Sequence, residues 1–219
     1  MFLQMWRIIH KKEDEDDRLY LPEEYRDPLP IPAEESETAL VLPYADNPLD
    51  EESVGALVYM QIIQNAKRYV YITTPYLIID DQMLGALTLA AKSGVDVRII
   101  TPHKWDKRTV HAITRSYYYA LWESGVKIYE YTPGFVHAKV VVSDDEKAVV
   151  GTINMDYRSL YHHFECATYL YKTSCIPDIE EDFQNTLAKC RPVTPESIKN
   201  EKFGYKLRGI LMKFISPLM

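Results

Sequence analysis

Cysteine is scarce in this sequence. The 219 residues include only Cys166, Cys175 and Cys190, and no two of them form a CxxC pair. Their number and spacing argue against a disulfide framework or a zinc site and are typical of unpaired thiols in a reducing compartment. Apolar runs also stay below the roughly 18 to 20 residues that span a bilayer, and the first residues lack a secretory signal. We therefore expect a chain that neither spans a membrane nor is exported.

Positive charge is in deficit, with 25 Lys and Arg against 32 Asp and Glu and a net charge of -7. A polyphosphate backbone attracts cationic surfaces, so nucleic acid is disfavoured as a partner. The deficit is local, because residues 1 to 55 carry 15 acidic and 5 basic side chains, whereas residues 56 to 219 carry 17 and 20. The acidity therefore belongs to the N-terminal segment.

An acidic, proline-containing leader is predicted over residues 1 to 37. The run from Glu13 to Asp17 places five like charges together, and four prolines follow it: Pro22, Pro28, Pro30 and Pro32. Prolines at this density exclude regular helix and resist sheet pairing, so we expect an extended linker over about residues 10 to 36. The apolar opening fits one or two turns of helix. Residues 38 to 219 then form the folded domain.

Strand and helix patterns alternate from Thr38 onward. Short β-branched or aromatic runs predict strands over 38–42, 69–73, 95–100 and 126–131, and amphipathic stretches predict helices over 50–66, 80–92 and 106–124. This alternation favours an α/β layered fold. Residues 136–143 and 146–152 then form two strands around a polar turn, which is a hairpin. A strand over 164–171 and helices over 177–190 and 195–215 complete the prediction.

The hairpin carries the most informative residues of the chain. Side chains two apart on a strand share a face, so His137 and Lys139 point the same way while residues 138, 140 and 142 point into the core. Asn154 lies just beyond the second strand, where Gly151 lets backbone or ligand come close. An imidazole, an ammonium and an amide that converge make a suitable cradle for a phosphate, with Lys139 supplying charge and Asn154 a neutral donor.

This spacing resembles the HxKx4Dx6G(S/T)xN signature of the phospholipase D superfamily. The matching residues are His137, Lys139, Asp144, Gly151, Thr152 and Asn154. Further stretches resemble the C-terminal half of bacterial cardiolipin synthases, from about residue 38 to the end: Thr74 to Tyr76, Ser93 to Arg98, Asn154 to Ser159, and Phe164 with Glu165. The resemblance implies a mixed β-sheet flanked by helices on both faces, and it implies neither a metal nor another cofactor.

The resemblance also assigns roles to residues. It implies that His137 is a nucleophile that forms a phosphohistidine, and that Lys139 and Asn154 bind phosphate oxygens. Glu165, 28 positions after His137, matches the acidic residue that accepts the Nδ1 proton and leaves Nε2 free to attack. The alternative for Glu165 is a buried carboxylate paired with a cation.

Three more residues belong to the predicted site. Thr152 fills the small-hydroxyl position of the motif, and the resemblance places Thr152 and Tyr76 against the substrate. Asp144 is part of the motif's catalytic set. Its place at the hairpin turn fits a structural role at least as well, because an aspartate there can cap the turn and hold neighbouring groups.

One motif is half of what the family uses, because a second histidine must protonate the departing alkoxide. Four of the other histidines lack a lysine two residues later: His103, His111, His162 and His163. His10 is followed by Lys12 and Asp17 at the motif's spacing, but Glu24, Tyr25 and Asp27 stand where the motif has its glycine, its small hydroxyl and its asparagine. We expect either the C-terminal half of a longer enzyme, whose N-terminal module supplies the second motif, or a single-motif chain that pairs with itself. The implied reaction transfers a phosphatidyl group between two phosphatidylglycerols and releases glycerol, at the cytoplasmic face of a bacterial membrane.

Two alternatives stay open beside this phosphatidyltransferase. One is another phosphodiesterase of the superfamily, including a nuclease, and the other is a non-catalytic, lipid-binding remnant. The last predicted helix leaves a related choice open. Its apolar face and its lysines are typical of a helix that lies on an anionic membrane surface, and equally of a helix packed on the domain with a basic outer face.

Overall fold

The structure is a computed structural model that describes residues 2–10, 22–23, 39–49 and 52–218. The chain divides into two compact units, Met1–Thr38 and Ala39–Met219. In the first unit, α1 (Phe2–His10) is the predicted N-terminal helix. The rest of the predicted leader, residues 11–21 and 24–37, lies outside the described residues, so the extended linker stays a prediction.

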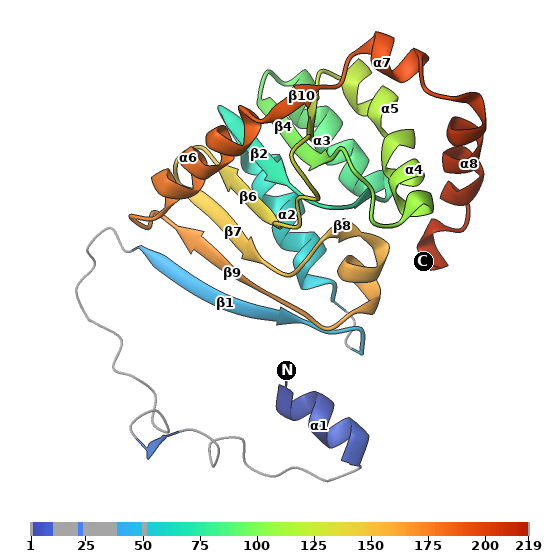
Figure 1. Cartoon of the computed structure of the whole chain (residues 1–219). Coiled ribbons are helices and arrows are strands. Elements are labelled where there is room, and N and C mark those ends of the chain that lie inside the picture. The colour runs from blue at the N-terminus through green and yellow to red at the C-terminus, as the bar shows by residue number, and fades with distance from the viewer. Residues whose placement is uncertain (1, 11–21, 24–38, 50–51, 219) are drawn as a thin grey trace. The chain divides into compact units, whose positions relative to one another are not determined.

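The second unit is built on an eight-stranded mixed sheet (Figure 1). The strand order is β1-β9-β7-β6-β2-β4-β5-β10, in which β2, β4 and β5 pair in parallel and every other neighbouring pair is antiparallel. The predicted hairpin forms the β6–β7 pair at the centre. The strands are β1 (Leu40–Asp46), β2 (Tyr69–Thr73), β4 (Asp96–Pro102), β5 (Lys127–Tyr131), β6 (Val140–Ser143), β7 (Lys147–Gly151), β9 (Glu165–Tyr171) and β10 (Cys190–Pro192).

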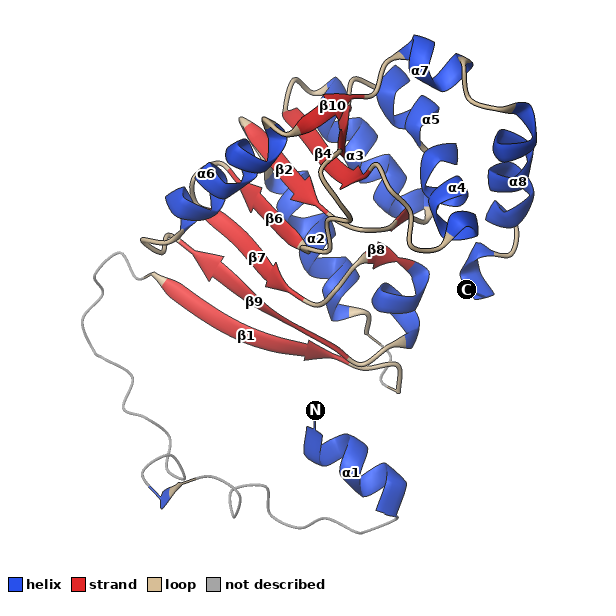
Figure 2. Ribbon diagram, in the orientation of Figure 1, coloured by secondary structure: helices blue, strands red, loops and turns tan. Residues whose placement is uncertain are grey.

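Helices cover both faces of this sheet, as expected (Figure 2). On one face, α2 (Val54–Asn65), α3 (Asp81–Lys92), α4 (Arg108–Ser116) and α5 (Tyr118–Glu123) bury the larger apolar cluster. On the other face, α6 (Ile176–Leu187) buries a smaller cluster through Ile176 and Phe183. The side chains of each strand alternate between the two clusters; Val141 belongs to the first and Val142 to the second. The helices α7 (Pro195–Lys199) and α8 (Phe203–Lys213) follow.

Local sequence explains where the elements begin and end. The side chain of Asp80 accepts a hydrogen bond from the backbone N–H of Met83 at 2.7 Å, which caps the start of α3. Gly94 then adopts a φ of 93°, a left-handed conformation that suits glycine and turns the chain into β4. The helix and strand predicted over 80–92 and 95–100 are therefore confirmed with small shifts at their ends.

Two predicted helices are interrupted. The helix expected over 106–124 divides at Tyr117 into α4 and α5. Tyr117 and Tyr118, at the division, are both almost fully buried. The helix expected over 195–215 is α7 and α8, separated by residues 200–202.

A second, two-stranded sheet has no counterpart in the prediction. It pairs β3 (Leu77–Ile78) in parallel with β8 (Met155–Asp156), and a π-helix, η3 (Arg158–His162), follows β8. The hydroxyl of Thr74 accepts a hydrogen bond from the backbone N–H of Met155 at 3.2 Å. This small sheet brings the chain after β2 next to the chain after β7, where Asn154 lies. Among the described residues, no helix has the length and apolarity to cross a bilayer.

Candidate active site

His137 and Lys139 lie on an extended segment that leads into β6, which begins at Val140. The imidazole is exposed, whereas Lys139 is only 8% exposed. Lys139 Nζ lies 3.0 Å from His137 Nδ1 and 2.6 Å from the His137 carbonyl oxygen, so the two side chains share a face as expected. Of the alternate residues expected in the core, Val142 is buried and Ala138 is exposed, because the segment before Val140 has left the strand.

The contact between these two side chains decides which ring nitrogen carries the proton. An ammonium only donates, so Nδ1 of His137 accepts from Lys139. The neutral ring then has its proton on Nε2. This tautomer is the reverse of the expected one, in which Nδ1 donates to Glu165 and Nε2 is free.

The surroundings keep the imidazole neutral. Partial burial and the Lys139 ammonium lower the pKa of His137 below its ordinary value of 6.5, with Asp106 acting in the opposite direction. Burial also lowers the pKa of Lys139, while the nearby charges of Glu165 and Asp156 oppose that shift. At neutral pH most of the His137 population is therefore unprotonated, which is the state that a nucleophile needs.

Glu165 lies at the start of β9 and is buried, but it does not make the expected hydrogen bond to His137. Its carboxylate accepts a hydrogen bond from the Thr152 hydroxyl, and its other oxygen lies 3.7 Å from Nδ1 of His163. Because Lys139 occupies Nδ1 of His137, the predicted orienting contact is not formed in this chain. Of the alternative, a buried carboxylate paired with a cation, the structure shows the burial and the approach to His163, which is a cation only when protonated.

Thr152 and Asn154 follow β7 and complete the predicted set on this side. The backbone N–H of Thr152 donates to the carbonyl of Cys166 at 2.8 Å, which ties this segment to β9. Asn154 Nδ2 donates to the Ser159 hydroxyl at 2.8 Å, while Asn154 Oδ1 is buried with no hydrogen-bond partner among the described residues. A hydroxyl can also donate, so a flipped amide would keep its bond to Ser159 and place Nδ2, a donor, at the buried position that Oδ1 now occupies.

Gly151 is required by the approach of two strands. It pairs with Ala167, and a Cβ at Gly151 would lie 2.4 Å from the Ala167 Cβ and 2.5 Å from the Cys166 carbonyl oxygen. The expectation that Gly151 permits a close approach is confirmed. The segment that lies close to Gly151 is strand β9, and Glu165 is the first residue of that strand.

The structure places Asp144 away from these residues, so the prediction that Asp144 is catalytic is wrong. Asp144 lies in the β6–β7 turn, at the opposite end of β6 from His137. Its carboxylate accepts three backbone N–H bonds, from Lys67 at 2.7 Å and from Arg68 and Tyr69 at 2.9 Å each. The Asp144 carboxylate therefore ties the β6–β7 turn to the backbone at the start of β2. This is the structural role that its position in the turn predicted as the alternative.

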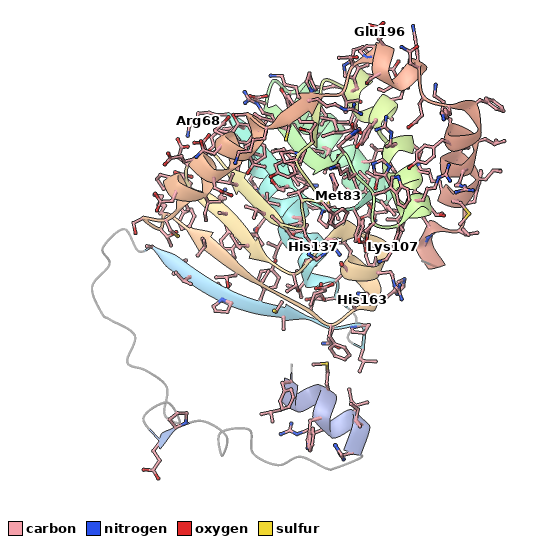
Figure 3. All side chains as sticks on the ribbon, in the orientation of Figure 1. Arg68, Met83, Lys107, His137, His163 and Glu196 are labelled. Carbon is pink, nitrogen blue, oxygen red and sulfur yellow. The ribbon has the colours of Figure 1, made fainter. Side chains whose placement is uncertain are left out.

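The ring of Phe135 lies between Tyr76 and the His137 imidazole and contacts both. The Tyr76 ring centroid is 6.2 Å from that of Phe135, which is 5.9 Å from that of His137. The Tyr76 hydroxyl donates to Asp106 at 2.5 Å, and Lys107 Nζ lies 5.4 Å from the Tyr76 ring centroid. Lys107 is close enough to His137 to lower the pKa of its imidazole, and Figure 3 labels both residues. The predicted substrate residue Tyr76 is therefore brought to the site, whereas Phe135, Asp106 and Lys107 were not predicted.

A pocket of about 290 Å³ opens next to Tyr76. Its wall is partly apolar, with two cationic side chains, and Asp156 is a buried acid in it whose pKa is raised by burial. Within the described part of the chain, no three His, Cys, Asp or Glu side chains gather as metal ligands would. The residues that line the pocket are Tyr76, Ile78, Lys107, Val110, Asp156, Tyr157, Arg158 and Ser216.

The fold and the His137–Lys139 pair define a class of protein. Residues 59–187 match the family described as cardiolipin synthase, PLD-like domain, and the chain belongs to this phospholipase D-like family. Two solved structures support the fold. A phospholipase D family member, Nuc, from Salmonella typhimurium has a TM-score of 0.60 at 18% identity, over 71% of this chain and 99% of that one. Phosphatidylserine synthase from Haemophilus influenzae has a TM-score of 0.65 at 12% identity, over 84% and 46%.

Several relatives have higher sequence identity. A Streptococcus mutans protein described only as uncharacterized is 52% identical over the whole chain, which covers 46% of that protein. The cardiolipin synthase of Halalkalibacterium halodurans is 38% identical over 80% of this chain and 35% of its own length. That of Geobacillus kaustophilus is 36% identical over the whole chain and 42% of its own length. The chain thus spans less than half the length of these relatives.

Proposed function

We propose that this chain supplies one half of a phosphatidyltransferase site of the cardiolipin synthase type. The observation that carries the proposal is the exposed His137 imidazole, whose pKa is lowered by partial burial and by the buried ammonium 3.0 Å from Nδ1. An exposed neutral imidazole beside a fixed cation suits attack on a phosphodiester, because the cation attracts the anionic oxygens. The cardiolipin synthases at 36% and 38% identity support the choice of reaction.

The proposed first step forms a bond between His137 Nε2 and phosphorus and breaks the bond from phosphorus to the glycerol oxygen. The leaving alkoxide takes a proton from a general acid and departs as glycerol. A hydroxyl of a second phosphatidylglycerol then attacks the phosphohistidine, gives up its proton to the same group, and restores the imidazole. The product is cardiolipin, and no atom or charge is left over.

This step requires the ring tautomer to change. Nε2 can attack only when its proton moves to Nδ1, which Lys139 now occupies. We propose that a bound phosphate draws the Lys139 ammonium onto its oxygens and that Nδ1 then donates to Glu165, whose negative charge already acts on Lys139. Asn154, with its amide flipped, would donate to a second oxygen that reaches its side chain, and Thr152 would hold Glu165 in place.

The general acid is left unassigned by this sequence, because among its histidines His137 alone carries the complete motif with the glycine, the small hydroxyl and the asparagine. We propose that a second phospholipase D-like unit faces His137, either from the remaining length of a longer protein or from a second copy of this chain. The reaction would then take place at the inner face of a bacterial cell membrane, where phosphatidylglycerol is present. The pocket beside Tyr76, with Lys107 and Arg158 in its wall, would hold the rest of the lipid headgroup.

A substrate panel tests the proposal. The chain is incubated over a range of concentrations with phosphatidylglycerol vesicles, phosphatidylcholine vesicles and single-stranded DNA, and the products are identified by mass spectrometry. We expect cardiolipin from phosphatidylglycerol alone, loss of product in His137→Asn, and a rate per chain that rises with concentration if a second copy completes the site. DNA cleavage that depends on His137 would show that the chain is a nuclease and not a phosphatidyltransferase. Turnover that is unchanged in His137→Asn would show that His137 is not the nucleophile.

A further inference from the structure

The outer face of α8 is apolar, which is unusual for a helix at a protein surface. Five large side chains lie at helical spacing along it and are between 42% and 82% exposed. Because they fall at positions i, i+4, i+7, i+8 and i+11, they form one continuous row. We call this row the α8 apolar row; its members are Phe203, Leu207, Ile210, Leu211 and Phe214.

The inner face of α8 is fixed to α4, so the outward direction of the row is set by the fold. Gly209 is buried, and a Cβ there would lie 2.3 Å from the carbonyl oxygen of Ala112. The Tyr205 hydroxyl donates to Nδ1 of His111 at 2.6 Å, which anchors the start of the helix. Turning the apolar row inward would break these contacts and force the α4 backbone and α8 apart.

The surroundings of the row are cationic. The helix contains no acidic residue; Arg208 is exposed on it, and the exposed Lys202 precedes it. Lys206 and Lys213 are half-buried, because Lys206 Nζ donates to the Lys199 carbonyl oxygen at 3.0 Å and Lys213 Nζ lies 3.9 Å from the Tyr117 ring centroid. The nearby carboxylate, Glu201, is already paired with Arg115. An exposed apolar row within basic side chains is complementary to an anionic bilayer, whose headgroups attract the cations while the apolar side chains enter the interface.

Further features extend this surface. A hollow of about 530 Å³ beside the start of α8 is lined by Arg108, Lys202 and Arg208. A neighbouring hollow contains Trp105, which is 55% exposed, together with Tyr205. Tryptophan is enriched where proteins meet the bilayer interface, because its ring is apolar and its N–H is polar.

The end of α8 leads to the candidate active site. The chain after the helix reaches Ser216, whose side chain lines the pocket next to Tyr76. From these observations we infer that the α8 apolar row and its basic border dock the domain on an anionic lipid surface. The inference rests on the proposed function for its purpose, since it brings headgroups to the pocket, but its test does not depend on catalysis.

Vesicle binding tests the inference. The chain is sedimented with vesicles of equal parts phosphatidylglycerol and phosphatidylcholine, and with vesicles of phosphatidylcholine alone. We expect binding to the anionic vesicles that weakens as salt is raised, and at least about tenfold weaker binding for the triple variant Leu207→Ser, Ile210→Ser, Leu211→Ser, because apolar insertion and charge act together. The matched control, Leu57→Ser with Leu89→Ser, alters equally exposed side chains on α2 and α3 and should bind as the parent does.

Two further measurements keep the outcomes distinct. Circular dichroism checks that each variant is folded, and His137→Asn should bind vesicles like the parent, so a failure of the proposed chemistry leaves this result unaffected. Equal binding by the triple variant, or equal binding to both kinds of vesicle, would overturn the inference. A fall in molar mass of the triple variant by light scattering, with vesicle binding intact, would instead assign the row to contact with a second copy.

Discussion

At the scale of single residues, the proposed chemistry depends on the pair His137 and Lys139. The ammonium is buried, holds Nδ1 of the imidazole and lies in the field of Glu165 and Asp156. A cation fixed in this way lowers the pKa of the neighbouring imidazole. In the proposed function it also binds phosphate oxygens.

Replacing this cation should raise the pKa of His137. In Lys139→Met the nearby positive charge is gone, so the protonated imidazole is less disfavoured, while the contribution of burial remains. The pKa of His137, measured by NMR titration of its ring protons, should lie above the parent value, and any acid limb of the activity profile should move to higher pH. An unchanged or lower pKa in Lys139→Met would contradict the assigned electrostatics.

Asp144 should matter for stability and not for chemistry. Asp144→Ala leaves three backbone N–H groups at the start of β2 without their charged acceptor, and we expect a loss of about 2 kcal/mol in the free energy of unfolding. Urea denaturation measures this loss, and Asp182→Ala, at an exposed position of α6, is the control. Catalysis or phosphate binding that disappears in folded Asp144→Ala would return Asp144 to the site.

The sequence allowed part of this site to be predicted. The pairing of His137 with Lys139 follows from strand periodicity, and Asn154 follows from its position after the second strand of the hairpin. Lys107 and Asp156 could not be found in the same way, because they reach the pocket through the β4–α4 loop and the small β3–β8 sheet, which carry no periodic signal. The hydrogen bond of Glu165 could not be predicted either, because it depends on which side chain lies nearest to the carboxylate in the folded chain.

At the scale of elements, the site depends on the distance between β7 and β9. Gly151 lets the two strands approach so closely that any side chain there would overlap Ala167 and Cys166. Thr152 and Asn154 follow directly, and Glu165 begins the facing strand, so the same contact sets the positions of three predicted site residues.

Gly151→Ala should therefore disturb both stability and site. We expect the added methyl to cost about 1 to 3 kcal/mol in the free energy of unfolding, because the neighbours that it meets are backbone and Cβ atoms that cannot rotate away. Activity should fall with it. The control is Gly85→Ala in α3, where nothing lies within 4 Å and helix propensity should add up to about 1 kcal/mol of stability. Equal stability of the two variants would show that β7 and β9 can separate freely.

Elements with strong local signals were predicted well, and elements made by tertiary contacts were not. The Asp80 cap and Gly94 bound α3 from within its own sequence. The break at Tyr117 has no such signal, because residues 106 to 124 contain no glycine or proline and no side chain caps the start of α5. The β3–β8 sheet is similar: each strand is two residues long, and neither has a pattern until the other lies beside it.

At the scale of the whole molecule, a buried carboxylate joins three elements. Glu130 of β5 is 1% exposed and accepts hydrogen bonds from Arg115 of α4, Arg191 of β10 and His103. Burial alone would raise its pKa, but the cations outweigh burial and hold the pKa below its ordinary value. The folded state therefore favours the ionised form, and this contribution to stability is present above the unfolded pKa and is lost as pH falls through the folded one.

Glu130→Gln should remove that contribution. We expect a loss of about 3 kcal/mol in the free energy of unfolding at pH 7, since Arg115 is left with one carboxylate partner in a mostly buried position. Urea denaturation of the parent and the variant between pH 7 and pH 3 should show the difference shrinking as the pH falls. Glu181→Gln, at an exposed position, should show no such difference. A gap that widens toward low pH would contradict the sign assigned to Glu130.

At this scale the main question is which steps of the proposed reaction one phospholipase D-like unit can perform alone. The chain spans less than half the length of these relatives, and one histidine, His137, carries the complete motif. In the proposed reaction the acid for the leaving group therefore comes from a second unit. The formation of the phosphohistidine can be separated from that need by the choice of leaving group. p-Nitrophenolate departs without a proton, so a p-nitrophenyl phosphodiester requires only the nucleophile and the phosphate-binding groups.

A burst experiment with this substrate tests the central claim that His137 is the nucleophile. The chain is mixed with the p-nitrophenyl phosphodiester of diacylglycerol, p-nitrophenolate is followed by absorbance, and the quenched protein is mapped by mass spectrometry. The account predicts a burst that approaches one p-nitrophenolate per chain, a phosphoramidate adduct on His137, and neither in His137→Asn. An adduct on any other residue, or a burst that persists in His137→Asn, would contradict it.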